Sequence, residues 1–164
     1  MRALPLIAAL SLGLAGVAVA CGGSIPMGAL RLPYDPAVWS AEQVGPDHWR
    51  ATPRDDQEGS TIDATISDAA CSEAAMAARV PTRGGGARTG RSTNRHGLRV
   101  IWAEGYTGCR NLTAGPVAAC VRERGRTWLF VTASRGCALT RYGAADPRAL
   151  LEGLKREDGS PTWR

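Results

Sequence analysis

Five cysteines are the residues of this chain whose type and spacing bear most on chemistry: Cys21, Cys71, Cys109, Cys120 and Cys137. No two of them have the C-x-x-C spacing of a redox-active site or of half a zinc site. An exported chain with an odd number of thiols must leave one unpaired or dimerise through it. We therefore predict two structural disulfides among the last four cysteines and a separate role for Cys21.

Four cysteines allow three sets of pairs. A hairpin about Gly125 would pair residues whose numbers sum to about 251, which places Cys120 opposite Val131 and carries Cys137 past it. This register disfavours the Cys120–Cys137 pair and the set that contains it. Of the two sets left, we favour Cys109 with Cys120 and Cys71 with Cys137, each bridge stabilising the fold by about 3 kcal/mol.

The two histidines, His48 and His96, give only a weak indication of catalysis. They do not have the H-x-x-x-H spacing of a metal site, and no G-x-S-x-G turn is present to expose a serine. We expect both to be surface histidines. A small periplasmic hydrolase that uses His48 or His96 with Asp or Ser residues stays as an alternative. Asp55, Asp56 and Glu58 fit a solvated turn, so we predict no metal site and no cofactor.

An arginine-rich stretch over residues 79–99 is the most distinctive run in the sequence, with six arginines and no acidic residue. We expect a loop here. Functionally, Arg83, Arg88, Arg91 and Arg95 could bind a polyanion such as lipopolysaccharide phosphate or anionic lipid headgroups. The stretch lacks an aromatic residue on which a base could stack, so nucleic acid is not an expected partner. The alternative is a solvated connection in which arginine is merely the default polar residue.

The first twenty residues have the three parts of a secretory signal peptide: a single basic residue, an apolar run, and small residues before the cut. Cleavage after Ala20 would make Cys21 the new N-terminus, and this position resembles the lipobox of bacterial lipoproteins, with Ala18 where that family usually has leucine. The resemblance implies acylation of Cys21 and a membrane partner reached through that lipid. Plain secretion to the periplasm stays open. Residues 21–29 would then form a flexible tether.

The remaining roughly 140 residues are enough for one domain with a genuine core, which we place at residues 30–157. Hydrophobic alternation and helix caps predict an α+β domain with a mostly antiparallel sheet of four to six strands and two main helices. Residues 158–164 would be a disordered tail, and most tryptophans would be core residues. We expect strands at 30–32, from 49, at 61–66, 98–104, 117–124, 127–133 and 137–141, and helices at 37–42, 69–79 and 147–157.

The Y-D-P-A-V-W entry at residues 34–39, followed by a mid-chain and a terminal helix, is faintly similar to the PsbP/Mog1-type α/β/α sandwich of small exported bacterial proteins. The similarity concerns the order of elements and transfers no functional residue. We therefore expect a non-enzymatic exported protein of the cell envelope that acts as a binding or accessory module. Its expected partner is an envelope protein or an anionic surface.

Overall fold

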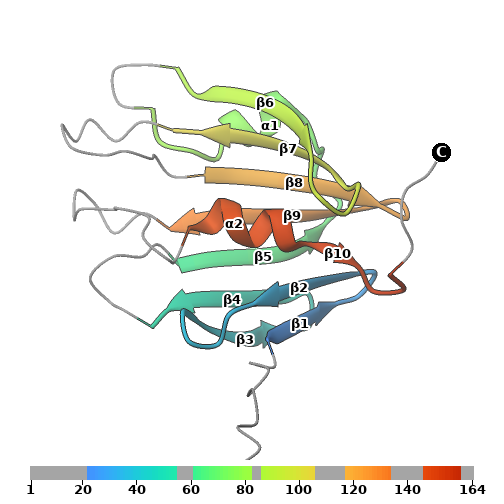
Figure 1. The fold of residues 1–164 in the computed structure, drawn as a ribbon. Coiled ribbons are helices and arrows are strands. Elements are labelled where there is room, and N and C mark those ends of the chain that lie inside the picture. Colours follow the sequence, from blue (N-terminus) through green and yellow to red (C-terminus); the bar gives the residue numbers. More distant parts are fainter. Residues whose placement is uncertain (1–21, 55–60, 83–85, 106–116, 134–145, 160–164) are drawn as a thin grey trace, which may run out of the picture.

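The computed structural model describes residues 22–54, 61–82, 86–105, 117–133 and 146–159 (Figure 1). Ten strands and two helices lie in these ranges. In chain order they are β1 Gly23–Met27, β2 Leu30–Tyr34, β3 Trp39–Gly45, β4 His48–Pro53, β5 Thr61–Ser67, α1 Glu73–Ala77, β6 Arg88–Thr93, β7 Arg99–Glu104, β8 Val117–Glu123, β9 Arg126–Ala133, α2 Pro147–Gly153 and β10 Lys155–Arg156.

Seven strands form one sheet in the order β3-β4-β5-β9-β8-β7-β6, and three form a small sheet in the order β1-β2-β10. Every recorded strand pair is antiparallel. The expected α+β fold with a mostly antiparallel sheet and two helices is confirmed. The described strands exceed the expected four to six, because β1, β3, β6 and β10 were not foreseen as strands.

The large sheet has a hydrophobic core on each face, as alternation along β8 makes clear. Ala119 and Val121 belong to a core shared with α2 and the small sheet, whereas Ala118 and Cys120 belong to a core shared with α1. The two helices therefore cover opposite faces of the large sheet, α2 over its centre and α1 over the β6–β8 end (Figure 1).

Two buried polar contacts hold the α2 layer in place. Trp128 Nε1 on β9 donates to the carbonyl of Met27 at 2.8 Å, which ties the small sheet to the large one. Asn94, only 4% exposed, donates from Nδ2 to the carbonyls of Leu151 and Leu154 at 3.0 and 2.8 Å. Since these carbonyls lie at the C-terminal end of α2, Asn94 fixes that end against the β6–β7 turn.

Two predicted segments were assigned the wrong structure. Residues 22–29 form β1 and its turn rather than a tether, because Ile25 and Met27 alternate into the core. Residues 37–42 are not a helix: the Asp35 carboxylate accepts from Ala37 N at 2.8 Å and closes a single turn, after which the chain enters β3. An Asp-Pro pair starts such turns as readily as it caps helices.

The two helices lie where they were expected but are shorter. Ser72 caps α1 by accepting from Ala75 N at 3.2 Å. Asp146 caps α2, with Pro147 at the first position of the helix. The helix ends at Gly153, and β10 follows it.

The β8–β9 hairpin is present, with its centre one residue earlier than predicted. Arg124 and Gly125 both have positive φ, 47° and 79°, which is the two-residue type I′ turn that matches strand twist. Cys120 therefore lies opposite Leu129 and not opposite Val131.

Several predictions fall on residues outside the described ranges: the signal peptide at 1–20, Cys21, Cys109, Cys137, Arg83, the strand at 137–141 and residues 160–164 of the tail.

Candidate binding site

One disulfide links the two sides of the α1 core. Cys71, just before α1, is bonded to Cys120 on β8, with a Cα–Cα distance of 5.6 Å. The predicted pairing of Cys109 with Cys120 and of Cys71 with Cys137 is therefore wrong. Cys71 packs against the α1 core and faces β8. Cys120 is fully buried, so the bond is a structural disulfide within the core.

The arginine-rich stretch is partly a strand, not a loop, and its described arginines differ in their surroundings. Arg88 Nη2 donates to Glu104 at 2.7 Å, and its guanidinium lies 5.7 Å from the centre of the Trp102 ring. Arg91 Nε donates to Glu73 of α1 at 2.6 Å, and this hydrogen bond is the main cause that holds the pKa of Glu73 below its usual range. These two cations are partly neutralised, which weakens a simple anion-binding role for them.

The histidines do not come together. His48 Nε2 lies 2.8 Å from Asp63 Oδ1, and Arg50 Nε donates to the same oxygen at 2.9 Å, on a face of β4 and β5. His96 lies in the β6–β7 turn, where its backbone N–H donates to Asn94 Oδ1. Among the described residues, no serine, threonine or cysteine side chain hydrogen-bonds to either imidazole. In the described ranges the hydrolase alternative thus has a His–Asp contact, with no hydroxyl or thiol hydrogen-bonded to the imidazole.

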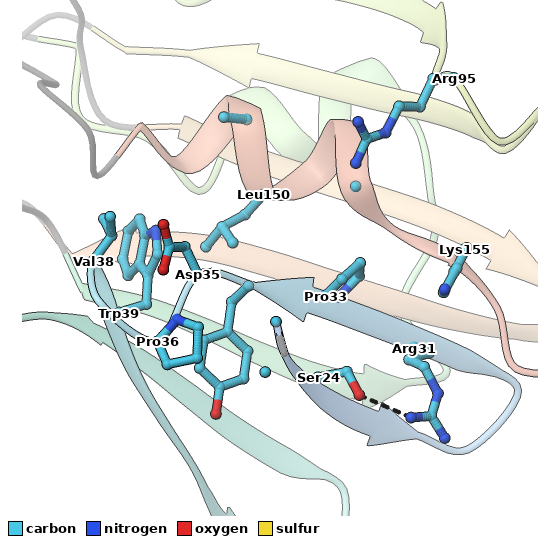
Figure 2. Close-up of a pocket in the computed structure, with 15 residues that line it drawn as sticks. Ser24, Arg31, Pro33, Asp35, Pro36, Val38, Trp39, Arg95, Leu150 and Lys155 are labelled. Atoms are coloured by element: carbon cyan, nitrogen blue, oxygen red, sulfur yellow. Dashed lines mark hydrogen bonds between the residues drawn. The ribbon is translucent and has the colours of Figure 1, made fainter. Parts of the chain in front are cut away.

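A groove of about 710 Å³ lies between α2 and the small sheet, and Figure 2 shows the residues that line it. Leu150 of α2 faces Pro33 of β2 across it, and Trp39 and Val38 lie at one end. The groove begins where the described chain begins, since Gly22 and Gly23 line it. We call this feature the α2–β2 groove; apolar side chains line much of it, together with three basic residues and one acidic residue, Asp35.

The cations on the rim of the α2–β2 groove are Arg31, Arg95 and Lys155. Arg31 is held by Glu157 and by Ser24, whose hydroxyl accepts from Nη1 at 2.8 Å. The hydrogen bond from Arg31 is the main cause that lowers the pKa of Glu157, and its counterpart raises the pKa of Arg31.

Lys155 and Arg95 lack such an arrangement. Lys155 lies directly opposite Arg31 in the β2–β10 pair, a juxtaposition of like charges that costs stability by itself. Within the described residues, neither Lys155 nor Arg95 has a recorded ion pair of its own. Two cations therefore face the groove with capacity for an anion.

A second, smaller cleft of about 170 Å³ lies on the other side of α2, over β6–β8. Its walls are Val100, Trp102, Val117 and Leu151, and charged side chains such as Arg88 surround them. This volume equals about five or six water molecules, so the Trp102 cleft suits one side chain or one ring rather than a whole cofactor.

In the described ranges no three His, Cys, Asp or Glu side chains are grouped as metal ligands. None of the helices in those ranges has the length and apolar character needed to cross a membrane. Comparison with protein-family models, with curated proteins and with solved structures found no match. The lipobox and PsbP/Mog1-type resemblances thus stay predictions.

Sequence reasoning singled out Arg95 but missed the α2–β2 groove. Its basic residues lie far apart in the chain, at positions 31, 95 and 155, and only the pairing of β10 with β2 brings two of them together. The one available signal was the alternation of Leu30 and Leu32, which places Arg31 on the opposite side of β2 from the core.

Proposed function

We propose that this chain is an exported protein of the bacterial cell envelope that works by binding, either tethered by lipid on Cys21 or free in the periplasm. The observation that carries the proposal is the Cys71–Cys120 disulfide, in which Cys120 is fully buried. Structural disulfides persist in oxidising compartments and are rare in the bacterial cytosol. The position of Gly22 at the α2–β2 groove adds that a lipid on the preceding residue would hold this groove close to the membrane.

The test is cell fractionation of a bacterium that produces the chain, with protease added to spheroplasts. We expect the protein outside the inner membrane, degraded by external protease and shorter than its full length. A Cys21→Ser variant should leave the membrane fraction if lipid anchors the protein, and should stay unchanged in the soluble fraction if it is secreted. Full-length protein protected in the cytoplasm would contradict the proposal.

A second function, binding of an anionic surface, is favoured by the like-charged neighbours Arg31 and Lys155 at the groove. Glu157 already offsets part of the charge of Arg31 and Lys155, but with Arg95 the groove still has more basic than acidic side chains and would attract an anion. The ligand chemistry that fits is a phosphate or carboxylate carried on an apolar body.

Vesicle sedimentation tests this second function. Vesicles with phosphatidylglycerol should retain the protein at low salt, and retention should fall steeply as the Debye length shrinks toward ~3 Å near 1 M salt. An Arg95→Ser, Lys155→Ser variant should lose retention, whereas Arg124→Ser, at a remote turn, should keep it. Equal retention by neutral vesicles, or by the double variant, would eliminate anion binding.

We also propose that the domain is a variant of the α/β/α sandwich, supported by the opposite placement of α1 and α2. Figure 1 shows that the small sheet shares one outer layer with α2.

A further inference from the structure

We propose that the outer edge of β6 is a docking site for an extended segment of a partner protein. The segment would add as an antiparallel strand and place one apolar side chain against Trp102. This inference rests on the binding role proposed above and specifies the kind of partner.

The position of β6 in the sheet is the first argument. It is the terminal strand, paired on one side with β7 and on the other with no described strand. Its register with β7 is regular over all six residues, from Arg88 opposite Glu104 to Thr93 opposite Arg99. In an antiparallel strand, alternate residues point their N–H and C=O groups outward, so about three residues of β6 have unpaired backbone groups. Such an edge is a template for another strand.

The other edge of the large sheet differs. In β3 the register shifts between Gln43 and Gly45, and Pro46 follows. Bulges and prolines are the devices by which proteins prevent edge-to-edge pairing. Since β6 has neither a bulge nor a proline, β6 is the edge better suited to accept a strand, and its exposed arginines, which also oppose pairing, select for an acidic segment.

Trp102 gives the β6 edge its specificity. Gly90 lies directly opposite Trp102, and a β-carbon on Gly90 would come within 3 Å of the indole ring. The missing side chain lets the half-buried ring extend over β6 toward the free edge. A strand added outside β6 would place the residue opposite Gly90 on this same face, where it contacts Trp102 at the border of the 170 Å³ cleft.

The charges of β6 determine the neighbours of that residue. The side chains of Arg88 and Arg91 are 74% and 66% exposed, and each uses one guanidinium nitrogen in its recorded ion pair. These ion pairs weaken the attraction for an anion but do not remove it, because the remaining guanidinium N–H groups can donate to a second carboxylate. An antiparallel segment meets Arg91 first and Arg88 last. It should therefore have an acidic residue opposite Arg91, an apolar residue opposite Gly90, any residue opposite Thr89 and a second acidic residue opposite Arg88.

The experiment uses the purified oxidised chain and a synthetic eight-residue peptide with Glu-Phe-Thr-Glu at its centre and Val or Thr outside it. Fluorescence anisotropy measures binding. Two further peptides carry N-methyl groups on alternate amides. We expect one methylated peptide to bind at least about tenfold more weakly, because its donors to β6 are lost, and the other to bind normally. Equal weakening, or no binding of the parent peptide at 1 mM, would overturn the proposal.

Hydrogen exchange and matched variants test the location. The peptide should slow amide exchange in β6 and leave β3 unchanged. Arg91→Glu should weaken binding about threefold to tenfold through charge reversal, whereas Arg124→Glu, equally exposed at 64%, should not. Protection of β3, or a dimer in sedimentation that the peptide does not dissociate, would contradict docking of a partner at β6. If the protein is exported and disulfide-bonded but does not bind the peptide, docking at β6 is refuted and the proposed function is not.

Discussion

Removal of the Cys71–Cys120 bond should lower stability by an amount that follows from the chain length it closes. The two cysteines are 49 residues apart. The loop-closure relation gives about 4 kcal/mol at 25 °C for a loop of this size. With a urea m-value of about 2 kcal/mol/M, the midpoint of unfolding should fall by roughly 2 M.

The assay is urea unfolding followed by tryptophan fluorescence, in a chain whose other cysteines are replaced by serine. A Cys71→Ala, Cys120→Ala variant is the matched control. Reducing agent should lower the midpoint of the first chain to that of the control and leave the control unchanged. Equal midpoints of the oxidised chain and the control would refute the assignment, as would a peptide map of the unsubstituted chain in which Cys71 is linked to Cys137.

Three other predictions concern the α2 layer. Asn94→Ala should lower the free energy of unfolding by about 3 kcal/mol, as measured by chemical denaturation. The reason is that two carbonyls at the end of α2 and two N–H groups in the β6–β7 turn lose their hydrogen-bond partner. Trp128→Phe should cost about 2 kcal/mol by orphaning the Met27 carbonyl, and a loss comparable to that of an exposed-site variant would contradict it. Arg31 depresses the pKa of Glu157 in the folded protein. This ion pair therefore stabilises the fold above the unfolded pKa of about 4.3, and the stabilisation is lost as the pH falls through the lower pKa of the folded state. Wild type should therefore exceed Glu157→Gln in urea midpoint at pH 7, and this difference should shrink as the pH falls below about 4.3.

The elements that sequence reasoning located are those whose local signals agree with burial. Pro147 after Asp146 marked the start of α2, and the hairpin at Gly125 was found because a positive φ needs such a residue. The strands β5 and β7 were found because their alternation matches a sheet with a buried face.

The elements that were missed lack such agreement. In β6 none of the six residues is buried, so no apolar alternation exists; the strand is held by its ladder with β7 and by Thr89 and Arg91, which both hydrogen-bond to Glu73. In β1 the apolar pattern is two residues long and interrupted by Pro26. The disulfide was misassigned for a related reason: which strand lies under α1 depends on the order of strands in the sheet, and no local pattern reports that order.

The central claim is that the chain works outside the reducing cytosol. Intact mass spectrometry of the protein from its producing cell tests it most directly, with thiols alkylated before reduction. The account predicts a chain that has lost its first twenty residues and in which Cys71 and Cys120 take up no alkyl group. A chain that begins at Met1 and is alkylated at every cysteine would contradict it.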